Sequence, residues 1–139
     1  MMTAPLYTRD ILRLASAIPF QLGFDAVEHG VELRSPTCGS RVRVAVKLDE
    51  DGRVASLAQA VEACAFGQAA SALMGASAAG RDASGMRAAL TAIDRWLAGE
   101  KAEPWPGFAA LDPVRDRPGR HGAVRLPFRA LLAAIEAKQ

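Results

Sequence analysis

The sequence predicts an α+β protein with an N-terminal helix, a three-stranded antiparallel meander, and then three or more helices packed on one face of the sheet. Three observations lead to this prediction. Apolar residues recur at helical spacing near the N-terminus, alternate with polar residues in the middle of the chain, and return to helical spacing after Cys64. Strands followed by a run of helices are typical of the α+β class. Because the chain has 139 residues, we expect one domain over residues 1–139.

The first expected helix lies in residues 8–18. Thr8 is a suitable N-cap, and Pro19 marks the end of the pattern. The apolar positions follow the spacing i, i+3, i+4, i+7 of an amphipathic helix: Ile11, Leu14, Ala15 and Ile18.

Three strands are expected next, in residues 25–33, 41–48 and 54–61. The first two alternate apolar and polar residues, which is typical of half-buried strands. The segment "RSPTCGS" between them contains Pro and Gly, so Cys38 is expected at the tip of a hairpin. In the first strand His29 falls on the apolar side, where a structural histidine is more common than a ligand.

Helical spacing resumes at about Ala65, so Cys64 is expected at a strand-to-helix junction. A second helix is expected from near Asp82 to Ala98, followed by a Pro/Gly-rich connection with one short helical turn at 108–111. The last helix is expected to begin near Pro127, because proline is common in the first turn of a helix.

Composition excludes several function classes. Half of the residues are hydrophobic and 23% are charged, as in a globular protein. The formal net charge of +2 lacks the broad basic excess of a general nucleic-acid binder. No apolar run is long enough to span a bilayer, and charges at Arg9, Asp10 and Arg13 interrupt any signal-peptide core. We therefore expect a cytoplasmic protein with neither a nucleic-acid nor a membrane partner.

The two cysteines, Cys38 and Cys64, are too few for a secreted disulfide framework and are expected to be reduced thiols. Backbone N–H groups at a helix N-terminus would stabilise a thiolate at Cys64. Three arginines near Cys38 in sequence would act in the same direction if they lie close in space: Arg34, Arg41 and Arg43. The alternative is that both are small buried hydrophobic residues, and their spacing matches no specific metal motif.

Few other residues indicate chemistry. His121 lies in a glycine-flanked segment beside Arg120 and is a candidate ligand or a solvated loop histidine. The sequence contains no carboxylate pair at a catalytic spacing, no phosphate-binding glycine loop and no nucleophile elbow. We therefore expect a protein that is not an enzyme.

Three segments, "SPTCGSRVRVAV", "EACAFGQAASALM" and "PVRDRPGRHGAVRLPFRALLAAIE", resemble the signature regions of the iron–sulfur cluster scaffold family, the IscU/SufU/NifU N-terminal type. This resemblance covers nearly the whole chain. It implies a site at one end of the molecule where three cysteines and an aspartate hold a nascent iron–sulfur cluster, or zinc in its place. The partners it implies are a cysteine desulfurase and the recipient or carrier proteins for the cluster.

Residue by residue, Cys38 matches the first family cysteine and Cys64 the second. Ser40 stands where the family has its aspartate, and Ala123 stands where the third cysteine is expected. Because alanine cannot ligate a metal, a stable site would need His121, a second subunit or a small thiol to complete it. The resemblance thus implies iron or an iron–sulfur cluster bound by Cys38, Cys64 and His121, with half of the usual ligand set missing.

Three functions follow from this incomplete resemblance. The first is a scaffold-like protein that receives iron and sulfide and passes on a cluster. The second is a sulfur acceptor that carries a persulfide from a desulfurase on one cysteine. The third is a cluster-free relative that regulates a desulfurase by docking alone.

Overall fold

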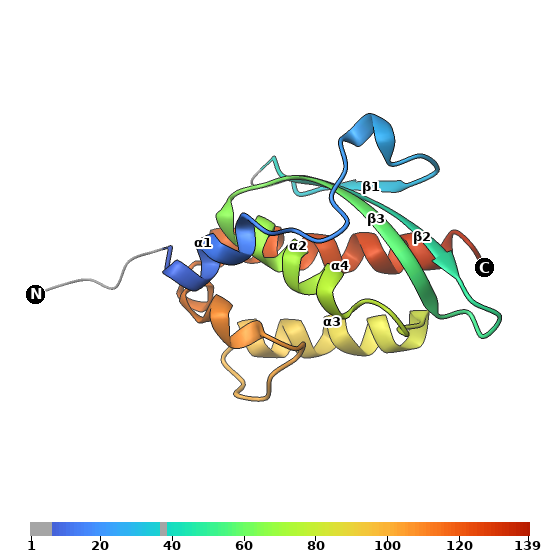
Figure 1. Ribbon diagram of the computed structural model, residues 1–139. Coiled ribbons are helices and arrows are strands. Elements are labelled where there is room, and N and C mark those ends of the chain that lie inside the picture. Colours follow the sequence, from blue (N-terminus) through green and yellow to red (C-terminus); the bar gives the residue numbers. More distant parts are fainter. Residues whose placement is uncertain (1–6, 37–38) are drawn as a thin grey trace, which may run out of the picture.

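The computed structural model describes residues 7–36 and 39–139 (Figure 1). The elements follow one another as α1 (Arg9–Ala15), η1 (Phe24–Ala26), β1 (Val31–Arg34), β2 (Arg41–Leu48), β3 (Val54–Glu62), α2 (Ala65–Ser77), α3 (Ala83–Leu97), η2 (Phe108–Asp116), η3 (Pro118–Arg120) and α4 (His121–Glu136), where η denotes a 3₁₀ helix. A helix, three consecutive strands and then helices confirm the predicted α+β class. Within the described residues, no helix is both long and apolar enough to cross a membrane.

The sheet is an antiparallel meander with the strand order β1-β2-β3. Arg41 at the start of β2 pairs with Glu62 at the end of β3. At the other edge, β1 pairs only with residues 41–44, so the second half of β2 extends beyond it. The two halves of β2 therefore have different neighbours.

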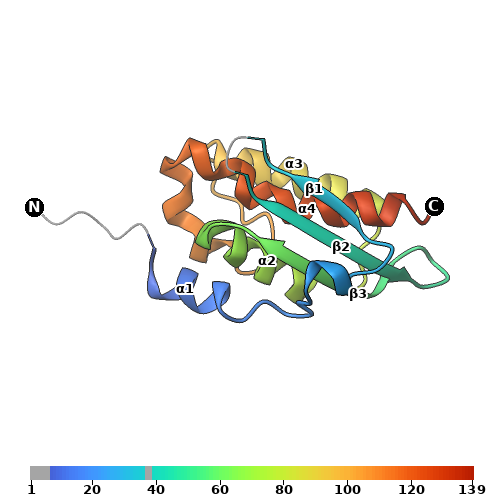
Figure 2. The same ribbon diagram turned by 90° about the horizontal axis from the view of Figure 1, so that it is seen from above.

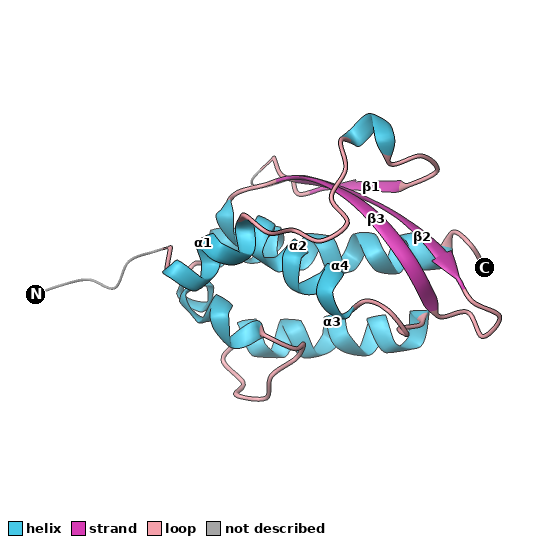
Figure 3. Cartoon of the chain, viewed as in Figure 1, coloured by secondary structure: helices cyan, strands magenta, loops and turns pink. Residues whose placement is uncertain are grey.

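The helices cover one face of the sheet, with α1, α2 and α4 in the layer next to the strands and α3 farther away (Figures 1 and 3). Seen from above, the strands lie across α2 and α4 (Figure 2). Val42, Val44 and Val46 alternate along β2 and are buried against these helices, as the sequence pattern predicts. Apolar burial between sheet and helices therefore fixes the register of the strands.

Residues 20–22 run along the free edge of β3, and η1 then lies over the other face of the sheet. Backbone N–H groups of Leu22 and Gln59 donate to the carbonyls of Gln59 and Phe20 at 2.8 and 3.0 Å. The Arg41 guanidinium lies 3.7 Å from the centroid of the Phe24 ring, and Arg43 donates to the Phe24 carbonyl at 2.8 Å. These contacts hold η1 over the outer face of the sheet, opposite the helices (Figure 1).

The first predicted strand is too long. Residues 24–30 form η1 and a turn, and only Val31–Arg34 form a strand. His29 has φ +58°, in the left-handed region, so it lies in this turn and the prediction that it occupies the apolar face of a strand is wrong. Val27 is buried because the turn packs against the protein, which explains why the alternating pattern misled the prediction.

The predicted start of the last helix is also wrong. Pro127 lies inside α4, which begins six residues earlier at His121. Proline has no N–H, so Pro127 cannot donate to the carbonyl of Ala123 one turn before it. The short helical turn predicted at 108–111 is present and extends as η2 to Asp116.

Candidate functional site

The β3–α2 junction carries the second cysteine. Cys64 is the N-cap residue of α2 and has extended backbone angles, φ −66° and ψ 171°. Its thiol is free and partly exposed, and the side chain makes no capping hydrogen bond to the helix. The prediction that Cys64 lies between a strand and a helix is confirmed. A thiol in this position adjoins the unpaired N–H groups of the first helical turn.

The connection from β1 to β2 approaches the same end of the sheet. The N–H of Ser35 donates to the carbonyl of Ser40 at 2.8 Å, and the N–H of Gly39 donates to the carbonyl of Ser35 at 3.1 Å. Gly39 has φ +71°, a conformation that favours glycine. Cys38, which the sequence predicts at the tip of this hairpin, lies outside the described residues. Since Arg41 pairs with Glu62, the end of this connection and the β3–α2 junction are neighbours.

The position matched to the third family cysteine lies against the start of α2. Ala123 is 1% exposed. A Cβ atom built on Gly67, in the first turn of α2, would lie 3.5 Å from the Cβ of Ala123 and 3.3 Å from its carbonyl oxygen. Gly67 follows Cys64 by three residues, so the structure brings position 123 close to the turn that Cys64 caps.

Ser40, which stands in place of the family aspartate, is also buried, at 4% exposure. It directly precedes β2 and belongs to the same end of the sheet as Cys64. Its side chain can offer only a neutral hydroxyl, whereas a carboxylate would bring a negative charge and two oxygen ligands. Among the described residues, positions 40 and 123 therefore lie near the β3–α2 junction, but their side chains supply neither a carboxylate nor a thiol.

His121 is the first residue of α4 rather than a loop residue, so that part of the prediction is wrong. Its Nε2 atom lies 3.0 Å from the carbonyl oxygen of Val114 and 3.2 Å from that of Arg115. Carbonyl oxygens only accept hydrogen bonds, so Nε2 carries the proton and donates to them. In the neutral imidazole, Nδ1 is then the nitrogen that is free to bind a metal.

The three arginines near the first cysteine are paired with carboxylates. Glu32 lies 3.3 Å from Arg34, 3.8 Å from Arg41 and 3.1 Å from Arg43. Arg41 also pairs with Glu62 at 3.0 Å. The positive charge that the sequence places near the cysteines is therefore largely offset, and these arginines hold the strand ends together instead.

Residues 7–36 and 39–139 contain no group of three or more His, Cys, Asp and Glu side chains that could hold a metal ion. The described ligand atoms near Cys64 thus do not make a complete tetrahedral site. A four-ligand site at this end of the protein would therefore need at least one ligand beyond these described side chains.

Sequence reasoning did not identify Gly67 as part of this site. A Cβ at this position would lie only 2.7 Å from the Cβ of Ala63 and 3.3 Å from the carbonyl oxygen of Ala123, so glycine allows the start of α2 to pack closely against both the β3–α2 connection and α4. The one available signal was a glycine within an alanine-rich helix, three residues after a cysteine.

A three-stranded meander, covered on one face by helices and bearing a cysteine at the β3–α2 junction, is the arrangement expected of a scaffold-type α+β domain. The structure is similar to that of a nitrogen-fixing NifU-like protein (N-terminal) from Brucella abortus, with a TM-score of 0.81, 32% sequence identity, and 96% of each chain covered. The chain belongs to this family of NifU-like N-terminal domains.

Two further solved structures share the fold. One is a hypothetical protein with a TM-score of 0.73 and 25% identity, covering 94% of this chain and 97% of the other. The other is a putative iron–sulfur cluster assembly scaffold protein for the SUF system from Fervidobacterium islandicum AW-1. Its TM-score is 0.73 at 18% identity, with 94% and 96% of the two chains covered. No protein-family model and no curated protein sequence matches the chain.

Proposed function

We propose that this protein is a non-enzymatic, scaffold-like component of iron–sulfur cluster assembly. It receives iron and sulfur as cargo on the thiolates of Cys38 and Cys64, with a cysteine desulfurase as the sulfur source, and passes the cargo to recipient or carrier proteins. Support comes from membership of the NifU-like family and from likeness to a structure described as a SUF-system scaffold.

The observation that carries the proposal is the contact between Gly67 and Ala123. It brings the position of the third family ligand against the helical turn that Cys64 caps. The end of the β1–β2 connection lies beside that turn through the Arg41–Glu62 register. The backbone arrangement thus suits thiolate binding of a cluster, even though Ala123 itself supplies no ligand.

Iron and zinc bound by thiolates take four ligands. Two thiolates from one chain leave two positions to fill. In this proposal His121 supplies one of them through Nδ1, and a thiol from solution or from a second copy supplies the other. Cargo bound in this way is labile, which suits a protein that transfers it.

The test is anaerobic reconstitution with ferrous iron, cysteine, a desulfurase and dithiothreitol, which reduces the persulfide sulfur to sulfide, followed by visible absorbance and metal analysis; intact mass is measured on a parallel sample without dithiothreitol. The wild type is compared with Cys38→Ser, Cys64→Ser and His121→Ala. We expect cluster absorbance and stoichiometric iron in the wild type, loss of both in the cysteine variants, and weaker retention in His121→Ala. A wild type that gains neither absorbance nor iron would contradict cargo binding.

A gain-of-function variant sharpens this test. Ala123→Cys restores the third thiol by adding one heavy atom beside Gly67, so we expect it to retain the cluster longer than the wild type. Ala130→Cys is the matched control, because Ala130 is also a buried alanine of α4 and lies two turns farther along the helix. Equal retention by the two variants would show that position 123 does not face the cargo.

The missing ligands at Ser40 and Ala123 favour a second candidate, a sulfur acceptor. In that function a Cys64 or Cys38 thiolate attacks the outer sulfur of the desulfurase persulfide. A new S–S bond forms, and the desulfurase cysteine leaves as a thiolate. A mass increase of one sulfur without bound iron would identify this function. Desulfurase binding with neither change would identify a regulator that acts by docking alone.

A further inference from the structure

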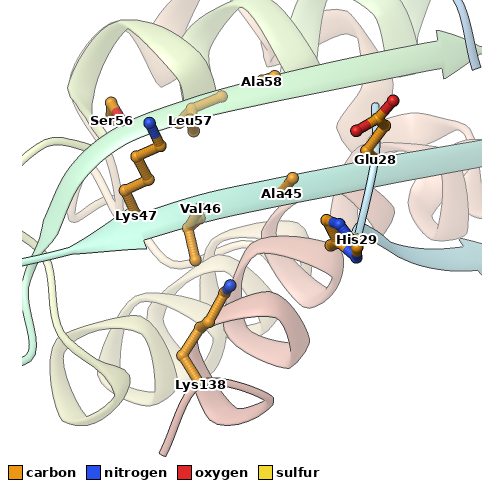
Figure 4. Close-up of a pocket in the computed structure, with 9 residues that line it drawn as sticks. All are labelled: Glu28, His29, Ala45, Val46, Lys47, Ser56, Leu57, Ala58 and Lys138. Carbon is orange, nitrogen blue, oxygen red and sulfur yellow. The ribbon is translucent and has the colours of Figure 1, made fainter. Parts of the chain in front are cut away.

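A second region of the molecule has the features of a small-molecule site. A cavity of about 260 Å³ lies where β2 extends beyond β1, toward the opposite end of β2 from Arg41 and Glu62. Figure 4 shows the residues that line it. The cavity is just smaller than the roughly 300 Å³ at which sites for drug-sized ligands begin. It therefore suits a smaller ligand.

The polar side chains around this cavity share one property. None of them forms an ion pair or a side-chain hydrogen bond within the described part of the chain. These side chains are Glu28, His29, Lys47, Ser56 and Lys138. By contrast, the arginines at the other end of the same sheet face are all paired with glutamates. Charged groups without partners that surround one cavity are available to a ligand.

Opposite charges lie at the two ends of the cavity. Figure 4 shows Lys47 and Ser56 at one end and Glu28 and His29 at the other, with Ala45 and Ala58 between them. Lys47 pairs with Ser56, and Ala45 pairs with Ala58, so these four residues occupy adjacent rows of the sheet's outer face. The two alanine methyl groups form a shallow apolar floor.

The turn that carries Glu28 and His29 is held in a fixed shape. His29 keeps a left-handed conformation at φ +58°, which is uncommon for residues other than glycine. A Cβ built on the next residue, Gly30, would lie 2.8 Å from the Arg43 side chain and 3.0 Å from that of Val27. Contacts with the sheet therefore set the position of this rim before any ligand binds.

We infer that this cavity binds a small zwitterionic ligand, a dipeptide with free termini. Its carboxylate lies toward Lys47 and Ser56, with the Lys138 ammonium reaching toward β2 from the end of α4, and its ammonium lies toward Glu28. An extended dipeptide spans about 7 Å, the length of two residues of a strand, so it can lie over Ala45 between Lys47 and the turn that carries Glu28. This inference is independent of the proposed role of the cysteines.

The experiment is a titration of the full-length, ¹⁵N-labelled protein with L-alanyl-L-leucine, followed by amide chemical shifts. We expect saturable shifts at residues 28–29, 45–47, 56–58 and 138, with a dissociation constant of about 1 mM. The N-acetylated dipeptide lacks the ammonium and the dipeptide amide lacks the carboxylate. Each is expected to bind about tenfold more weakly, since each loses one charge-assisted interaction.

Substitutions of the charged residues around the cavity test whether the dipeptide binds there. Lys47→Ala and Glu28→Gln are expected to weaken binding about fivefold to tenfold, while the spectrum itself reports whether each variant is folded. Lys101→Ala is the matched control, because Lys101 is an exposed lysine that does not line this cavity. The inference is overturned if no saturable shift occurs at these residues, if both blocked dipeptides bind as well as the free one, or if Lys101→Ala weakens binding as much as Lys47→Ala.

Discussion

The two ends of the sheet's outer face are built from the same strands but differ in how their charges are used. At the cysteine end, Arg41 and Arg43 are bound to Glu32 and to residues of the neighbouring strand or of η1. At the cavity end, Lys47 lies two rows away and forms no ion pair or side-chain hydrogen bond with any described residue. The arginines at the cysteine end therefore stabilise the contacts between strands, whereas the lysine at the cavity end is available to bind a ligand.

The two ends of the sheet also differ in how strongly their backbone conformation is restricted. The cysteine end has close backbone approach at Gly67 and a left-handed residue at Gly39, and both restrict its conformation. The cavity end has small side chains and unpaired charges on its surface. We therefore expect substitutions at the cysteine end to change stability and substitutions at the cavity end to leave it almost unchanged.

The largest effect is expected for Gly67→Val. A Cβ at this position meets Ala63 at 2.7 Å and the Ala123 carbonyl at 3.3 Å, so the start of α2 must shift away from the β3–α2 connection and from α4. We expect a loss of about 1–3 kcal/mol in the free energy of unfolding, measured by urea denaturation. Gly119→Val is the control, since nothing lies within 4 Å of a Cβ at that position. Equal losses in the two variants would show that the contact between the helices is not tight.

A smaller effect is expected for Gly39→Ala. Gly39 has φ +71°, and an alanine there must either adopt a left-handed conformation or distort the turn. The expected loss in unfolding free energy is about 1 kcal/mol. Gly23→Ala tests the explanation, because Gly23 has φ −68° and open space around it. If Gly23→Ala destabilised the protein equally, the cost would not come from backbone conformation.

The Arg41–Glu62 ion pair is expected to contribute less. Glu62 is 66% exposed, so solvent screens the pair, and a double-mutant cycle with Arg41→Gln and Glu62→Gln should give a coupling of about 0.2–1 kcal/mol. The coupling should fall as salt is added. The Arg87–Glu136 pair at 3.1 Å provides a comparison away from the cysteines. A coupling that does not change with salt would contradict an ion pair.

The smallest effect is expected at the cavity end. Lys47→Ala removes an exposed ammonium that has no partner among residues 7–36 and 39–139, so the unfolding free energy should change by less than about 0.5 kcal/mol. Thermal or urea unfolding measures this directly. A loss above about 1 kcal/mol would show that Lys47 has a structural role, and the contrast between the two ends would not hold.

Periodicity predicted the fold because burial sets it. The alternation of apolar and polar residues in 41–48 correctly predicted β2. The helical spacing of apolar residues after Cys64 correctly predicted the junction between β3 and α2. The start of α4 was predicted wrongly because proline is common in the first turn of a helix. In this protein Pro127 instead lies inside α4, where tertiary packing outweighs that local preference. The turn at His29 was missed because Val27 and Val31 continue an alternating pattern across it.

The candidate site could be predicted only in part. Local sequence located Cys64, and the family resemblance marked positions 40 and 123, but the contact of Ala123 with Gly67 joins residues distant in the chain. The same is true of the cavity, where Lys138 at the end of α4 meets residues of the sheet. Pairings of this kind depend on tertiary packing, which no local pattern encodes.

The contact between Gly67 and Ala123 also has an evolutionary consequence. The backbone of Gly67 and the methyl group of Ala123 meet at the junction of two helices, where Ala123 is buried. A single substitution that exchanges this methyl group for a thiol would alter the chemistry of the site and leave the architecture in place. We therefore expect that alanine and cysteine can replace one another at position 123 in related sequences while the fold is kept.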